Sequence, residues 1–214
     1  MKYEWRKADK SIYLPKTKPE VIEVPQMKYF MLEGKGNPND QEFSEAIEAL
    51  YTVSYAVRMS HKSEVTPDGY YEYTVFPLEG IWDIEEEARG QDILDKNKLI
   101  YTIMIRQPDF LTDELAQIII EKTKDKKPNK LIEQIRYDSL NEGLNVQMMH
   151  IGKYDDEPES FKLMEEFCYE NDLVRIDKRH KELYISDFRK TAPDKLKTVL
   201  RFKVKKKLSD NKGI

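Results

Sequence analysis

Apolar side chains follow two different periods along this chain of 214 residues. In the stretch 41–60 large apolar residues return every three or four positions, which indicates an amphipathic helix that begins after Asp40 as its N-cap. The stretch 158–170 has the same helical spacing. Four shorter stretches are rich in aromatic, β-branched or alternating apolar residues and predict strands: 70–76, 98–106, 182–186 and 197–204.

A weak internal repeat organises these elements. The sequence MLEGK at 31–35 resembles MHIGK at 149–153, and each precedes a Pro- and Asp-rich turn. A helix follows each turn, and its first large apolar residue is Phe43 in one copy and Phe161 in the other, at the same offset as the matching Met, Gly and Lys. Each copy is therefore predicted to run strand, helix, strand, strand.

Two such copies predict an α+β fold, in which a continuous antiparallel sheet carries the helices on one face and a ligand cleft on the other. Thr112 is the predicted N-cap of a helical insertion that breaks at Pro128 and could act as a lid or as a bridge between the copies. Residues 1–24 are expected to form an extended lead-in. We expect one domain over 1–214, with repeat one at 20–110, the helical insertion at 111–140 and repeat two at 141–207.

Charge and composition exclude several classes of protein. The 36 basic and 40 acidic residues give a net charge of −4, without the basic face that nucleic-acid binding needs. A lone cysteine, Cys168, cannot form an internal disulfide and indicates a reducing cytoplasm, and no Cys/His spacing suits zinc. No apolar run approaches the roughly 20 residues of a membrane helix. The three histidines are far apart in the sequence and predict no ligand set.

Strand alternation singles out Glu182 and Tyr184 as candidate site residues. In the stretch 182–186 these two share a face, and Leu183 and Ile185 share the other, which we expect to pack under the helices. Glu182 and Tyr184 then point into the cleft. A carboxylate in that position is costly unless it is paired or faces a ligand.

Aromatic residues are dense around residues 70–82. Tyr71 and Tyr73 share one face of their predicted strand, and Glu79 and Trp82 follow at a kink where Pro77 and Gly80 interrupt it. One interpretation is a cage that binds a flat or cationic ligand. The other is that these tyrosines are ordinary sheet residues, because Tyr favours strands.

Several segments resemble the GyrI-like small-molecule-binding family: PLEGIW at 77–82, MIRQPDF at 104–110, and ELYISD at 182–187 followed by TAPDKLKT at 191–198. The resemblance covers about 11–206. It implies a tandem duplication of strand-helix-strand-strand units, of the SHS2 type, with a ligand cleft between them. Relatives include effector domains of multidrug-responsive regulators, gyrase-inhibitory proteins and stand-alone proteins, of which one subfamily hydrolyses the cyclopropane ring of DNA-alkylating cyclopropanoid compounds.

The chain is most similar to the stand-alone type, since it has no helix-turn-helix region. The resemblance implies that Glu182 is the pocket carboxylate, and it maps the family's Glu–Trp motif onto Glu79 and Trp82. Two positions depart from the family: Phe188 stands where relatives often have Pro, and Ile81 where they often have Leu.

Three hypotheses about function follow. The first is a detoxifying hydrolase that needs no cofactor or metal, in which Glu182 or Glu79 activates a water. The second is a protein that sequesters a small aromatic or cationic molecule, and the third is a gyrase-modulating interaction protein. Direct nucleic-acid and membrane contacts are not expected, and a protein partner is left open. The expected ligand-binding residues are Trp82, Tyr184, Tyr71, Tyr73, Tyr101 and Met104.

Overall fold

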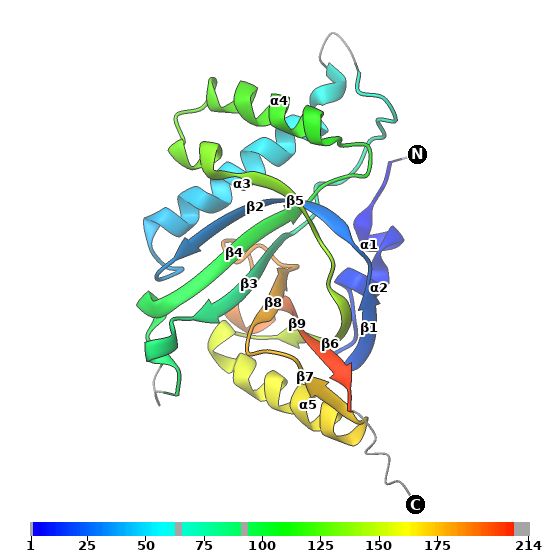
Figure 1. Ribbon diagram of the computed structural model, residues 1–214, viewed down its shortest axis with the longest axis vertical. Coiled ribbons are helices and arrows are strands. Elements are labelled where there is room, and N and C mark those ends of the chain that lie inside the picture. The colour runs from blue at the N-terminus through cyan, green and yellow to red at the C-terminus, as the bar shows by residue number, and fades with distance from the viewer. Residues whose placement is uncertain (1, 63–65, 91–93, 208–214) are drawn as a thin grey trace, which may run out of the picture.

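A curled antiparallel sheet runs through the whole computed structural model, which describes residues 2–62, 66–90 and 94–207 (Figure 1). Among these residues the sheet order is β1-β6-β9-β8-β3-β4-β2-β5, and β7 pairs with β9. The strands are β1 (Glu20–Val24), β2 (Met27–Lys35), β3 (Leu78–Ile84), β4 (Leu99–Arg106), β5 (Arg136–Leu140), β6 (Gly143–Ile151), β7 (Leu173–Arg175), β8 (His180–Tyr184) and β9 (Lys197–Lys206).

Among the described residues, three longer helices lie on or beside this sheet and two single-turn helices lie near the N-terminus. The helices are α1 (Trp5–Ala8), α2 (Lys10–Tyr13), α3 (Gln41–Arg58), α4 (Asp113–Lys124) and α5 (Glu157–Glu170). Short 3₁₀ turns complete the fold: Ser60–Lys62, Glu86–Ala88, Lys96–Lys98, Lys130–Gln134, Tyr154–Asp156 and Pro193–Lys195. The Thr112 hydroxyl accepts a hydrogen bond from the Leu115 amide, as expected of an N-cap, whereas the Asp40 side chain makes no such bond before α3. No helix of the described residues is long and apolar enough to cross a membrane.

The predicted strand-helix-strand-strand order occurs twice, and the α+β class is confirmed. One copy is β2-α3-β3-β4 and the other is β6-α5-β8-β9, with β3 and β8 paired at the centre of the sheet. The copies also exchange strands, because β1 pairs with β6 and β5 pairs with β2. The two copies therefore share one sheet.

Three local predictions need correction. Residues 70–76 do not form a ladder strand, since Tyr73 makes only an isolated bridge to Tyr3, and the strand of this region is β3. The lead-in contains α1 and α2 as well as an extended stretch, and the predicted helical insertion ends in β5. Residue 1 and residues 208–214, at the ends of the predicted domain, lie outside the described residues.

Each face of the sheet is covered by different elements. Phe43 of α3 packs edge-on against the Tyr101 ring, with 4.9 Å between ring centres, on the face that also receives α5. The opposite face carries buried charges: Lys181 lies 2.7 Å from Glu79 and 2.6 Å from Glu142. Tyr13 of α2 reaches this network and donates a hydrogen bond to Glu79. The helix α2 therefore covers the face turned away from α3 and α5.

Candidate functional site

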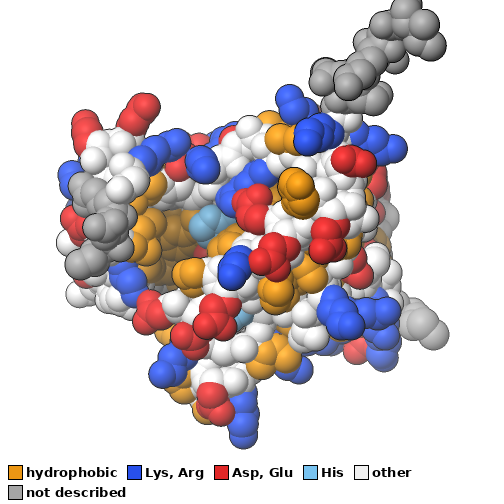
Figure 2. All heavy atoms as spheres, turned by 90° about the horizontal axis from the view of Figure 1, so that it is seen from below, with side chains coloured by type: hydrophobic (Ala, Val, Ile, Leu, Met, Phe, Trp, Pro, Cys, Tyr) orange, Lys and Arg blue, Asp and Glu red, His pale blue; other side chains and the backbone are white. Residues whose placement is uncertain are grey.

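A cavity of about 720 Å³ lies between α3 and α5. Figure 2 shows a hollow lined mainly by hydrophobic side chains, with charged side chains around its rim. Its wall combines residues of α3, β3, β8 and α5 with the segment 74–77 that leads into β3. The lining residues include Phe43, Trp82, Glu157, Phe161, His180, Glu182 and Tyr184. A cavity of this size accommodates a drug-sized molecule.

The cavity lies on the sheet face that carries the two long helices, and this differs from the expectation of a cleft opposite them. Trp82 pairs directly with His180 on the neighbouring strand, so both side chains point to one face. Trp82 contacts Phe43 of α3 at 5.7 Å and His180 contacts Phe161 of α5 at 4.8 Å, both between ring centres. Each helix covers one half of the sheet, and the gap between them is the cavity.

Strand alternation is as predicted within β8, which ends at Tyr184, whereas Ile185, expected on the face of Leu183, lines the cavity. Glu182 and Tyr184 line the cavity, while Leu183 is fully buried on the other face. The predicted assignment of the two faces is reversed, because Leu183 packs on the side covered by α2 and not under α3 and α5. Alternation along a strand shows which residues share a face, but it does not show which face the helices cover.

An aromatic wall forms at the centre of the sheet. The Trp82 indole donates a hydrogen bond to the Tyr184 hydroxyl at 2.8 Å. Gly80 lies beneath this contact, and a Cβ atom there would be only 2.9 Å from the indole nitrogen. Tyr101, the partner of Trp82 on β4, packs against the indole on the side away from His180, at 5.4 Å between ring centres. The absence of a side chain at Gly80 thus makes room for the indole and the phenol together.

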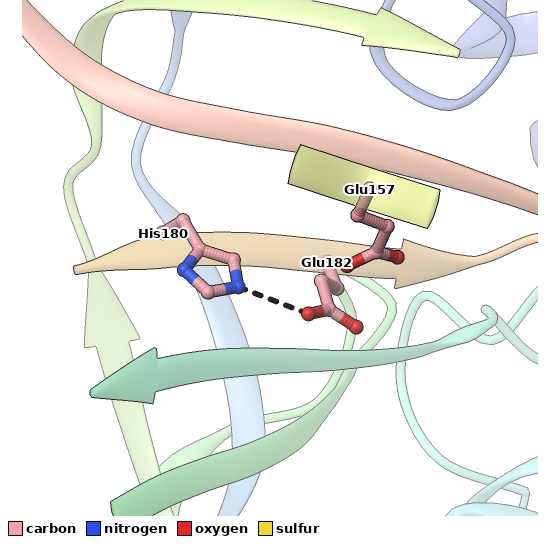
Figure 3. A group of neighbouring side chains, drawn as sticks. All are labelled: Glu157, His180 and Glu182. Carbon is pink, nitrogen blue, oxygen red and sulfur yellow. Dashed lines mark hydrogen bonds and ion pairs between the residues drawn. The ribbon is translucent and has the colours of Figure 1, made fainter. Parts of the chain in front are cut away.

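Two carboxyl groups and an imidazole meet beside this wall (Figure 3). His180 Nε2 lies 3.0 Å from Glu182 Oε1, and one ligand atom from each of Glu157, His180 and Glu182 lies within 4.8 Å of the others. Glu157 comes from the first turn of α5, whereas the other two come from β8. Glu157 and Glu182 are both buried, with 7% and 8% of their surfaces exposed.

The protonation of this group is unusual. Burial, and then the charge of Glu182, raise the pKa of Glu157 to about 10, so Glu157 is neutral at pH 7. Burial and the same charge hold the pKa of Tyr184 well above its usual range. The wall therefore presents two groups that keep their protons at neutral pH, Glu157 and Tyr184, beside Glu182.

Glu157, His180 and Glu182 also form the one group among the described residues whose spacing could admit a metal ion. Their existing contacts favour a network of shared protons instead. His180 Nε2 is already engaged by Glu182 at 3.0 Å, and a carboxyl oxygen of Glu157 lies within 4.8 Å of that carboxyl group. We therefore do not assign these residues as metal ligands.

The other sequence-predicted residues lie away from the cavity surface. Glu79 and Met104 pair directly on the opposite face of the sheet, where both are buried. Tyr71 and Tyr73 pack around Phe110 and do not line the cavity. Tyr101 lies behind Trp82, with 4% of its surface exposed. The structure thus brings Trp82, Glu182 and Tyr184 together.

Sequence reasoning missed Glu157 and His180. Alternation along β8 could have placed His180 beside Glu182, since the two are separated by a single residue. Glu157 gave a weaker signal, because an acidic residue in the first turn of a helix is usual and is favoured by the helix dipole.

The sequence model of the GyrI-like small molecule binding domain matches residues 17–205, and the chain belongs to this family. The family resemblance expected from the sequence is confirmed. No curated protein gives a significant match.

Solved structures from Listeria innocua are similar over nearly the whole chain. An uncharacterized conserved protein is 36% identical, with 95% of this chain and 100% of that chain covered and a TM-score of 0.88. Another crystal structure, of a protein described as a hydrolase, is 34% identical, with the same coverage of both chains and a TM-score of 0.86. The EcmrR C-terminal domain shares the fold at 14% identity and a TM-score of 0.52, with 88% of this chain and 98% of that chain covered.

Proposed function

We propose that this protein is a hydrolase that detoxifies small aromatic compounds by adding water to a cyclopropane ring, as in cyclopropanoid DNA-alkylating agents. The observation that carries the proposal is the position of Glu182, a buried carboxylate in the wall of a drug-sized cavity beside the Trp82 indole. Similarity to Listeria innocua proteins described as hydrolases supports it.

In the proposed reaction Glu182 accepts a proton from water while the water oxygen bonds to a ring carbon. The strained C–C bond breaks, and its electron pair moves through the conjugated system to a carbonyl oxygen, which then takes up a proton. A hydrogen-bond donor must stabilise the charge on that oxygen. Tyr184, whose oxygen already receives a hydrogen bond from Trp82, is suited to this part.

Glu79 is less suited to act as the base. Its carboxylate is held by Lys181 at 2.7 Å and by the Tyr13 hydroxyl at 3.1 Å, on the other face of the sheet. A catalytic base must reach the proton that it abstracts, directly or through one water. Glu182 meets this condition for a molecule in the cavity, because its side chain lines the wall.

The test is to incubate the purified protein with a cyclopropanoid alkylator and to follow the gain of one water by mass spectrometry. We expect many turnovers per protein molecule, a loss of about 100-fold or more in Glu182→Gln, and normal turnover in Glu159→Gln, which alters an exposed glutamate on α5. Saturable quenching of tryptophan fluorescence without turnover would favour a sequestering protein instead. Neither turnover nor binding would reject this class of ligand.

A further inference from the structure

Glu157 is a buried carboxyl group for which the reaction above has no role. It lines the cavity at the start of α5, and among the described residues its Oε1 atom has no hydrogen-bond partner. A carboxyl oxygen of Glu157 lies within 4.8 Å of one of Glu182. Within the described part of the chain, neither glutamate forms an ion pair with a lysine or an arginine, and Glu182 contacts the His180 imidazole at 3.0 Å. No lysine or arginine therefore neutralises the two carboxyl groups.

Two buried carboxyl groups this close, without a lysine or arginine between them, are too costly to ionise together, so the pair holds a proton. The other groups that face Glu157 and Glu182 do not remove the need for a proton on the pair. Asp155 adds negative charge next to Glu157, and His180 and Tyr184 contact Glu182. Cations at the mouth are engaged elsewhere, since Lys96 pairs with Asp155 at 3.2 Å and Arg189 with Asp187 at 2.9 Å.

We infer that Glu157 and Glu182 hold one proton between them, that Glu157 carries it in the resting cavity, and that Glu157 delivers it to the substrate oxygen. This inference rests on the proposed hydrolysis and makes Glu157 a second catalytic residue. An acid and a base this close together can perform both proton transfers of a water addition.

The proton balance closes without any further reactant. Glu182 takes a proton from the attacking water as the oxygen–carbon bond forms and the ring C–C bond breaks. The carbonyl oxygen gains the electron pair and takes the proton of Glu157. The proton on Glu182 then passes to Glu157, which restores the resting pair. One water has been added, and both carboxyl groups return to their starting states.

The first test needs no substrate. Infrared spectroscopy at pH 7 should detect the C=O stretch of a protonated carboxyl group in the wild-type protein. We expect this band to be absent in Glu157→Gln and to be present in Glu159→Gln, which serves as the matched control on the same helix. An unchanged band in Glu157→Gln, or no band in the wild type, would overturn the shared proton.

The second test is kinetic. Glu157→Gln keeps a hydrogen-bond donor toward Glu182 but cannot release a proton, so kcat should fall about 100- to 10,000-fold. The wild-type rate should fall at high pH as Glu157 ionises, and the variant should lose this alkaline limb. Glu157→Asp keeps a carboxyl group and should retain the limb at a reduced rate, which separates loss of the proton from loss of the fold.

The outcomes also separate this inference from the proposed function. Wild-type turnover with an unchanged rate and pH profile in Glu157→Gln would overturn the role of Glu157 and leave the hydrolase standing. Inhibition by a chelator that added Zn²⁺ or Mn²⁺ reverses would likewise overturn it in favour of a metal site. Absence of turnover in the wild type would reject the hydrolase and with it the delivery step, whereas the infrared band would still decide whether the proton is shared.

Discussion

Gly80 and Glu182 lie directly opposite each other on β3 and β8, and this pair sets the shape of the cavity wall. Gly80→Ala would place a Cβ atom 2.9 Å from the Trp82 nitrogen and 3.3 Å from the Tyr184 oxygen. We expect the indole to be displaced and its hydrogen bond to Tyr184 to be lost, at a cost of about 1–3 kcal/mol in the free energy of unfolding. Ligand titration followed by tryptophan fluorescence should show weaker binding. An unchanged affinity would mean that this wall does not contact the ligand.

Glu157 should also make stability depend on pH. Its pKa is raised in the folded protein to about 10, whereas in the unfolded chain the carboxyl group has its ordinary pKa of 4.5. A raised pKa gives stability that is fully present below the unfolded pKa and is lost as pH rises toward the folded pKa. Relative to wild type, Glu157→Gln should therefore gain stability with rising pH between these values, by up to roughly 1 kcal/mol per pH unit. Urea unfolding at pH 5 and pH 8 measures this, and equal differences at the two values would contradict it.

At the scale of elements, β8 presents different chemistry on its two faces. Glu182 faces the cavity, and Lys181 enters the buried network between Glu79 and Glu142. Lys181→Met would leave two carboxylates buried without their main partner, and should cost about 3–5 kcal/mol in the free energy of unfolding. Lys178→Met, at an exposed position before β8, is the control. A cost below about 1 kcal/mol for Lys181→Met would show that the network relaxes or admits water.

The same network predicts sensitivity to acid. Burial alone would raise the pKa of Glu142, but Lys181 and Arg201 outweigh it and lower that pKa overall. A lowered pKa gives stability that is present above the unfolded pKa and is lost as pH falls through the folded one. We expect wild type to lose stability below about pH 4.5 more steeply than Glu142→Gln, as measured by urea unfolding across that range. Parallel curves would argue against a charged Glu142.

Helical spacing was enough to predict α3 and α5, because one side of each helix is buried along its length. The strand at 78–84 was hidden by Pro77 and Gly80, which usually interrupt a strand, although here the glycine admits an indole. The aromatic stretch 70–76 resembled a strand, but its side chains pack on Phe110 and on one another. The carboxyl pair escaped prediction because its members come from different elements and only the fold brings them together.

At the scale of the whole molecule, neither repeat has a complete sheet of its own. Residues 141–207 alone would lose the pairing of β8 with β3 and of β6 with β1. We expect this fragment to remain unfolded by circular dichroism, and the full chain to unfold in one transition with coincident circular dichroism and fluorescence signals. A folded fragment, or two separate transitions, would show that the repeats are independent units.

The exchange of β1 has a consequence for biosynthesis. Glu20 pairs with Gln147, so β1 leaves the ribosome well before its partner and stays unpaired until β6 has been made. Contacts between residues so distant in sequence slow folding, and unpaired strands invite aggregation while they wait. Charged residues at Glu20 and Glu23 give this waiting strand some protection. The strand β1 is thus synthesised well before it can be paired.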